Sequence, residues 1–247
     1  NKTITTLGLS WNNFGSTTGA VECIADSLGS NSTLLKIDLS DCGFRDDGVS
    51  TLAQKLVSRN TTLQKLALGR NSITSTGVGM LLESMKQSSH HITDLDLQRN
   101  PIGNEGASLL ARTLGNNALP NLKRLCLSDC GIGDDGFIAL VSALEQNTSL
   151  LQLDLRTGVS GLAYLALVQS LPKIKVLQQV DFHWSTGLAS AMLFLKEGLR
   201  ENTSLFRVRI AGCAPDSVPP LPEQTARCAG GWKQEMESLG YRNRCLT

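Results

Sequence analysis

The chain has 247 residues, of which 41% are hydrophobic but only 4% aromatic, so its interior must be filled mainly by aliphatic side chains. Its 23 basic residues nearly balance its 22 acidic ones, and the net charge of +1 argues against a nucleic-acid binder or a protein held on anionic membranes. The longest apolar run, near residues 162–168, is far shorter than the roughly 20 residues of a membrane-spanning helix.

A strand-like segment followed by a helix-like segment recurs along the chain. The first part alternates apolar and polar residues, as in Leu34-Leu-Lys-Ile37-Asp-Leu39, and predicts a short strand with one buried face. The second part has apolar residues at i, i+3, i+4 and i+7, as from Val49 to Leu56, and predicts a helix with one buried face. The units begin 27–30 residues apart, at Ile4, Leu34, Leu63, Ile92, Leu122, Leu150, Leu177 and Leu205.

The constant order of one strand and one helix per unit predicts an α/β solenoid of about eight repeats. Because helices are wider than strands, the stack should curve into a horseshoe, with a parallel β-sheet on the concave face and α-helices on the convex face. We expect this array to fill residues 1–213 as a single domain, and we expect altered turns around residues 156–190, where Gly158 replaces the usual Asn or Cys.

The two ends of the array are predicted to differ. The proline-rich stretch after Cys213 opens residues 214–247, which we expect to form a C-terminal capping segment that covers the exposed end of the core. No comparable segment precedes Ile4, so the sequence favours an array truncated at its N-terminus.

The unit resembles the leucine-rich repeat, L-x-x-L-x-L-x-x-N/C-x-L. Its length of 28–29 residues is similar to that of the ribonuclease-inhibitor-like subfamily, and Asn71 and Asn100 beside Cys42 and Cys130 match the Asn/Cys mixture at its ninth position. Because such repeats commonly serve as inhibitors, scaffolds and ligand-sensing parts of immune receptors, the resemblance implies a non-enzymatic module that binds a protein on its concave sheet. The subfamily also includes Ran GTPase-activating proteins, which stay as an alternative, although the C-terminus here is basic where theirs is acidic.

Candidate binding residues follow from the strand register, in which the third, fifth and seventh positions face the concave side and the eighth lies at its rim. Arg70 and Arg99 are rim neighbours that could anchor a partner carboxylate or simply pair with adjacent acids. Trp184 draws attention because Trp and Arg often dominate interface energies, although it could instead fill the space beside Gly158. The predicted protein-binding residues are Trp184, His183, Arg156, Asp154, Asp181, Arg209, Arg70, Arg99 and Asp96.

The sequence predicts no cofactor, no metal ion and no small-molecule substrate. It has only three histidines and no C-x-x-C pair, and its glycines and paired acids recur at one repeat position, as helix starts do. Seven scattered cysteines favour a reducing, cytoplasmic setting. Cys42, Cys130 and Cys213 are predicted to be structural, Cys126 could be reactive, and Cys228 and Cys245 could pair under oxidising conditions.

Four N-x-S/T sequences share one phase of the repeat, at the turn between a helix and the next strand. We expect their asparagines to form turns through local hydrogen bonds. If they were glycosylated instead, the chain would be an extracellular recognition domain, and this alternative stays open. The four residues are Asn31, Asn60, Asn147 and Asn202.

Overall fold

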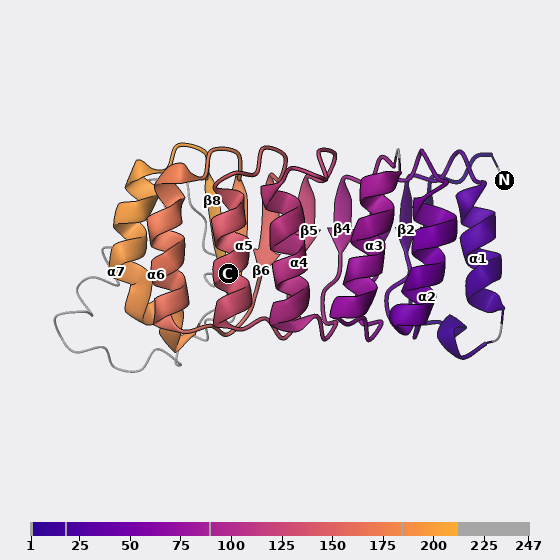
Figure 1. Cartoon of the computed structure of the whole chain (residues 1–247), viewed down its shortest axis with the longest axis horizontal. Helices are drawn as coiled ribbons and strands as arrows, with labels where there is room; N and C mark the ends of the chain where they lie inside the picture. Colours follow the sequence, from indigo (N-terminus) through magenta and orange to yellow (C-terminus); the bar gives the residue numbers. More distant parts are fainter. Residues whose placement is uncertain (1, 18, 89, 184, 212–247) are drawn as a thin grey trace.

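The computed structural model describes residues 2–17, 19–88, 90–183 and 185–211, which form an eight-stranded parallel sheet backed by helices (Figure 1). The strands follow one another in chain order, and each pairs in parallel with the next. The predicted capping segment, residues 214–247, lies outside the described residues. The strands are β1 Thr6–Gly8, β2 Lys36–Asp38, β3 Lys65–Ala67, β4 Asp94–Asp96, β5 Arg124–Cys126, β6 Gln152–Leu155, β7 Gln179–His183 and β8 Arg207–Ala211.

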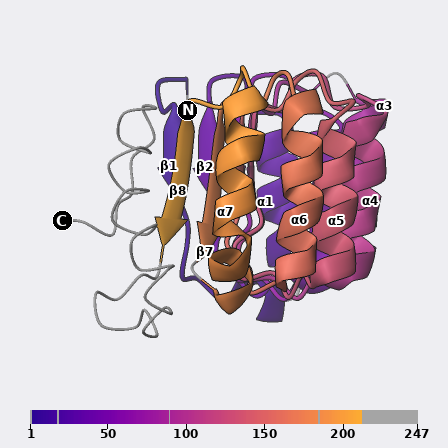
Figure 2. The same cartoon turned by 90° about the vertical axis from the view of Figure 1, so that its left-hand side faces the viewer.

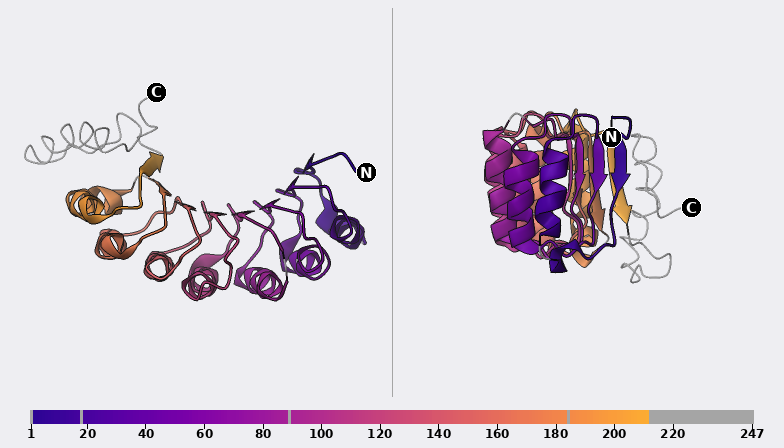
Figure 3. Two further views of the ribbon diagram at one scale, coloured as in Figure 1. Left: turned by 90° about the horizontal axis from the view of Figure 1, so that it is seen from above. Right: turned by 90° about the vertical axis from the view of Figure 1, so that its right-hand side faces the viewer.

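Each of the strands β1–β7 is followed by a helix that returns the chain along the outer side. The α-helices are α1 Ala20–Gly29, α2 Arg45–Leu52, α3 Ser75–Gln87, α4 Gly103–Gly115, α5 Asp134–Leu144, α6 Gly161–Ser170 and α7 Thr186–Glu201. Short helical turns are η1 Phe14–Ser16 and η3 Leu171–Lys173, and η2 Ala53–Val57 is a π-helical continuation of α2. Seen from above, the strands line the inside of an arch and the helices its outside (Figure 3), and the end view separates the same two layers (Figure 2). The predicted horseshoe is therefore confirmed.

The core is an aliphatic ladder between the two layers. Ile37, Leu66, Leu95, Leu125 and Leu153 pair in register along the sheet, and each is at most 3% exposed. Because a single repeat cannot enclose these side chains, neighbouring repeats must stack to bury them. Truncating one of them to alanine should cost about 2–5 kcal/mol.

Buried asparagines close the turns after β3 and β4. Asn100 is 1% exposed, and its Oδ1 accepts hydrogen bonds from the backbone N–H groups of Asn71 (2.8 Å) and Ile73 (3.0 Å) in the preceding repeat. Its Nδ2 donates to the carbonyl oxygens of Leu68 (2.9 Å) and Leu97 (2.8 Å). The amide thus satisfies four buried backbone groups, and a hydrophobic side chain would leave all of them except the Leu97 carbonyl, which also accepts from Cys130, without a partner.

The same position holds cysteine in other repeats. The thiol of Cys42 donates to the carbonyl of Leu9 (3.1 Å), and that of Cys130 donates to the carbonyl of Leu97 (3.2 Å). Both side chains are fully buried, so the structural role predicted for these two cysteines is confirmed. Cys213, predicted to act in the same way, lies outside the described residues.

The rim turns of the first five repeats share one backbone conformation. In each, the eighth-position residue has a positive φ between 54° and 64°, and its N–H donates to a backbone carbonyl of the following repeat. This left-handed conformation costs a non-glycine residue roughly 1–2 kcal/mol, which the repeated hydrogen bond helps to offset. The residues are Trp11, Asp41, Arg70, Arg99 and Asp129.

The sixth repeat departs from this pattern, within the region where altered turns were predicted. Thr157 has no positive φ, and its hydroxyl donates to the carbonyl of Ile132. Strands β6 and β7 lengthen to four and five residues, from three in β1–β5. Phe137, Tyr164 and Phe182 pack edge-to-face or tilted, with ring centroids 5.3–6.2 Å apart. Most of the buried aromatic side chains that the structure describes therefore lie beyond Asn100, the last of the two buried asparagines that close the turns after β3 and β4.

Acidic residues at the helix starts act between repeats. The sequence places Asp46 where it could cap its own helix, but both carboxylate oxygens instead accept from Thr74, through the backbone N–H (2.8 Å) and the hydroxyl (2.6 Å), one repeat later. Asp134 binds the N–H and hydroxyl of Ser160 in the same way. These two acids therefore link neighbouring repeats, because the stacked helices bring the next helix N-terminus within reach of their carboxylates.

Candidate functional site

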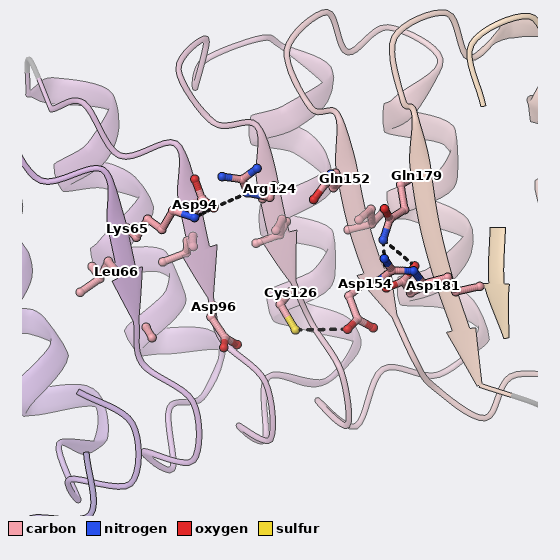
Figure 4. Close-up of a pocket in the computed structure, with 15 residues that line it drawn as sticks. Lys65, Leu66, Asp94, Asp96, Arg124, Cys126, Gln152, Asp154, Gln179 and Asp181 are labelled. Atoms are coloured by element: carbon pink, nitrogen blue, oxygen red, sulfur yellow. Dashed lines mark hydrogen bonds and ion pairs between the residues drawn. The ribbon is translucent and has the colours of Figure 1, made fainter. Parts of the chain in front are cut away.

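The concave face of the sheet holds a hollow of about 350 Å³ over strands β3–β8 (Figure 4). Its floor is formed by the fourth-position leucines and its sides by polar residues at the third and fifth positions. Four of the nine predicted binding residues line it: Asp96, Asp154, Asp181 and Arg209. Other lining residues were not predicted to bind, among them Lys65, Asp94, Arg124, Cys126, Gln152 and Gln179.

The third-position row carries a cation–anion–cation triad. Lys65 Nζ lies 3.2 Å from Asp94 Oδ1, and Arg124 Nε donates to the same oxygen from the other side. Burial alone would raise the pKa of Asp94, but hydrogen bonds from Arg124, Thr93 and Lys65 outweigh it and lower that pKa. This row therefore brings two positive charges and one negative charge to the wall of the hollow.

Asp154 is the most heavily bonded acid of the fifth-position row. Arg156 donates two hydrogen bonds to it, from Nε to Oδ1 (3.0 Å) and from Nη2 to Oδ2 (2.7 Å). The hydroxyl of Ser128 donates to Oδ1 at 2.9 Å. The hydrogen bond and charge of Asp154 raise the pKa of Arg156 despite partial burial. A two-pronged contact of this kind fixes both side chains, so the structure brings these two predicted residues together.

Asp181 and Arg209 also meet, more loosely. Arg209 Nη1 lies 3.6 Å from Asp181 Oδ2, and Gln179 Nε2 donates to Asp181 Oδ1 at 3.0 Å. Burial is the main cause that raises the pKa of Asp181, helped by the negative charge of Asp154, and the Gln179 and Arg209 contacts do not fully offset it.

Asp96 accepts hydrogen bonds only from uncharged donors among the described residues. Two come from Gln98, whose backbone N–H and Nε2 each lie 2.9 Å from a carboxylate oxygen, and the thiol of Cys126 is a further hydrogen-bonding partner. No ion pair to Asp96 occurs among residues 2–211 as far as they are described. Burial, and then the charge of Asp154, raise the pKa of Asp96.

Cys126 lies between these acids and is not an activated thiol. Its Sγ donates to Asp154 Oδ2 at 3.5 Å. Burial and the negative charges of Asp154 and Asp96 raise its pKa well above the ordinary thiol value, which disfavours the nucleophilic thiolate. The sequence-based hypothesis of a reactive Cys126 is therefore contradicted.

The predicted rim pair lies apart from the hollow. Arg70 Nη1 is 3.7 Å from Asp41 Oδ2, and its guanidinium carbon lies 5.4 Å from the ring centroid of Trp11. Arg99 Nε is 3.3 Å from Asp129 Oδ2. Each arginine is thus already paired with an acid of the rim, and Trp11, which is 72% exposed, leans along the array toward Arg70.

Two other predicted residues cannot be joined to the hollow. His183 is the exposed last residue of β7 and does not line it. Trp184, the aromatic anchor expected from the sequence, lies outside the described residues. The sequence does contain a signal for the triad that was not predicted. The third position of three successive repeats holds Lys65, Asp94 and Arg124, which places alternating charges on neighbouring strands.

The turn asparagines act as the turn hypothesis predicted. Asn60 Oδ1 accepts from the N–H groups of Thr62 and Leu63, while its Nδ2 donates to two carbonyls of the preceding turn. Asn147 and Asn202 bind in the same way, and these three residues are at most 9% exposed. The amide nitrogens of these three residues are held by backbone carbonyls, which makes them poor glycan acceptors.

Two further features concern the residues that the structure describes. None of their helices combines the length and the apolar character that a membrane span requires. Their His, Cys, Asp and Glu side chains form no group of three or more that could hold a metal ion.

A family model agrees with this repeat architecture. A family model described as "Leucine Rich repeat" matches residues 30–53, 59–82, 88–111 and 118–141. A search of curated protein sequences finds no match. Among solved structures, the chain is similar to a tropomodulin C-terminal domain from Caenorhabditis elegans, with 16% identity, a TM-score of 0.47, and 62% of this chain and 90% of that one covered. It is also similar to the structure of the yeast Rad7 and Elc1 complex, with 16% identity, a TM-score of 0.49, and coverage of 85% and 59%.

Proposed function

This chain is a leucine-rich-repeat protein, and on that premise we propose that it is a binding module that takes a protein partner on its concave sheet. The observation that carries the proposal is the hollow over β3–β8, a recess on the concave surface that charged side chains of both signs surround. A surface of mixed charge fits a protein partner better than a polyanion, whose phosphates would meet Asp96, Asp154 and Asp181.

The chemistry of the hollow favours recognition over catalysis. The residues that line it include no histidine, and its cysteine is held as a thiol by burial and by two acids. Three of its four carboxylates are paired with cations of the same chain, which fixes their positions in the way that specificity requires. No feature of the hollow favours the GTPase-activating alternative.

Site-specific photo-crosslinking tests which face the partner contacts. A photoreactive amino acid at Ala67 or Gln152 places the probe inside the hollow, and one at Ser108 or Ser142 places it on exposed positions of the convex helices. All four variants are incubated with the same cell extract, and the adducts are identified by mass spectrometry. We expect one protein to be captured from both concave positions and from neither convex position.

A protein captured only from the convex positions would overturn the proposal. A second measurement guards against accidental capture: an excess of unlabelled wild-type chain should compete with the concave adduct, and the same excess of an Arg156→Ala, Arg124→Ala double variant should compete less well. Both arginines are about half-exposed, so this variant should fold normally.

A further inference from the structure

We propose that the hollow receives a lysine or arginine side chain of the protein partner, whose positive charge pairs with the carboxylate of Asp96. This inference rests on the proposed function, because it names the chemistry by which the concave face would recognise its partner. Three features of the molecule support this role of Asp96: the charge balance of the hollow, the space above the residue, and the surroundings of its carboxylate in the free chain.

The charge balance singles out Asp96. The other three aspartates that line the hollow each have a cation of the same chain: Asp94 has Lys65 and Arg124, Asp154 has Arg156, and Asp181 has Arg209. In the described part of the chain the hydrogen-bond donors to Asp96 are Gln98 and the thiol of Cys126, and none of them carries a charge. Its negative charge is therefore the one in this hollow that stays open to a partner.

The space above Asp96 is free because its neighbours are small. In the sheet register its fifth-position neighbours are Ala67 on β3 and Cys126 on β5, so no long side chain of its own row covers the carboxylate. Figure 4 shows Asp96 at the level of Cys126 and Asp154, away from the Asp94–Arg124 pair. The recess of about 350 Å³ is near the lower limit of small-ligand pockets, which suits one or two inserted side chains.

The electrostatic surroundings select a cation. Burial and the negative charge of Asp154 already disfavour the ionised form of Asp96 and raise its pKa. An anionic group would add to this repulsion, whereas an ammonium or guanidinium group would relieve it and form a charge-assisted hydrogen bond. A metal ion fits less well, because the other carboxylates are committed to arginine and lysine and the described residues form no three-ligand group.

Selection from a random-peptide display library on the purified chain tests the inference and does not require the partner itself. Peptides are selected on the wild type, and each is then measured on four chains: wild type, Asp96→Asn, Asp38→Asn and Ala67→Trp. Asp38 is the matched control, because it holds the same strand position on β2, accepts the N–H of Ser40 as Asp96 accepts that of Gln98, and lies outside the hollow. Ala67→Trp fills the recess without changing any charge.

We expect the selected peptides to share one Lys or Arg position and to lose binding to the Ala67→Trp chain. Asp96→Asn should weaken their binding at least tenfold, replacement of the shared cation by glutamine should weaken it equally, and Asp38→Asn should leave it unchanged. Thermal unfolding of each variant verifies that the chain is folded.

The two proposals fail in different ways. Peptides that Ala67→Trp excludes, but that share no cation or bind Asp96→Asn as tightly as the wild type, would overturn the role of Asp96 and leave concave binding standing. If the only peptides recovered are indifferent to Ala67→Trp, or none is recovered, the concave site and the inference both fail.

Discussion

The first five repeats and the last three are held together by different interactions. In the first group, buried Asn71 and Asn100 bridge the rim turns, and the residue before them adopts a positive φ. In the second group, no such asparagine follows β6, the strands are longer, and Tyr164 and Phe182 fill the core by packing against each other and against Phe137 of the fifth repeat. A polar turn ladder and an aromatic core are thus two solutions to the same stacking problem. The hollow spans the boundary between them, with β3–β5 from one group and β6–β8 from the other.

Removing a ladder amide should have the largest effect on stability. Asn100→Ala leaves the N–H groups of Asn71 and Ile73 and the buried carbonyl of Leu68 without partners, and it leaves the carbonyl of Leu97 with only the thiol of Cys130. Each unsatisfied buried group costs about 1–3 kcal/mol, and partial relaxation should leave a total loss of about 3–5 kcal/mol in the free energy of unfolding. Urea denaturation monitored by circular dichroism measures it.

The chain supplies a control at the same repeat position. Asn12 is exposed, and its Nδ2 donates to Leu9 and Ser10. Asn12→Ala should cost less than about 1 kcal/mol, since water can replace these contacts. Equal losses for the two variants would mean that the ladder does not hold the first five repeats together.

Much of this first region could be predicted from the sequence. The buried ladder and the rim turns follow from a repeat whose spacing is nearly constant, so that Leu66 or Asn71 is fixed by its column alone. The charged pairs could not be predicted as safely. Whether Lys65 and Arg124 both reach Asp94, or leave it for another acid, depends on side-chain length and direction across three strands.

In the aromatic core, a substitution that restores the usual residue of the repeat should lower stability, by less than the loss of a buried asparagine. Phe182 occupies a ladder position that is Leu in β2–β6, yet Phe182→Leu, which restores the repeat pattern, should destabilise the chain by about 1–2 kcal/mol. The reason is the loss of its contacts with Phe137 (6.2 Å) and Tyr164 (5.6 Å). Thermal and urea unfolding measure the change.

The reciprocal substitution is the control. Leu68→Phe inserts a ring at the same column in the asparagine-laddered region, where Leu68 is fully buried, and overpacking should cost about 1–3 kcal/mol. A neutral Phe182→Leu would show that the aromatic residues are interchangeable with leucine and that the two regions pack alike.

The smallest expected effect is a gain in stability when Asp96 is replaced by Asn. It distinguishes Asp96 from the acids of the hollow that are paired with cations. The pKa of Asp96 is raised, so the folded chain binds its proton more tightly than the unfolded chain, in which the pKa is near 3.9. The free energy of unfolding must then fall as the pH rises from the unfolded pKa through the raised folded one. The free energy of unfolding of the neutral Asp96→Asn chain should be higher than that of the wild type by about 0.5–1 kcal/mol at pH 7. It should also fall less steeply as the pH rises.

The same substitution at Asp94 should act in the other direction. Its pKa is lowered mainly because its cationic partners outweigh burial, so the paired carboxylate adds stability above the unfolded pKa and loses it as the pH falls through the lowered folded one. Asp94→Asn should therefore destabilise the chain at pH 7, while Asp38→Asn changes little. Urea titrations of the three variants between pH 4 and 7 measure these signs. If Asp96→Asn destabilised the chain as Asp94→Asn does, the carboxylate of Asp96 would already be stabilised within the chain, and its charge would not be available to a partner.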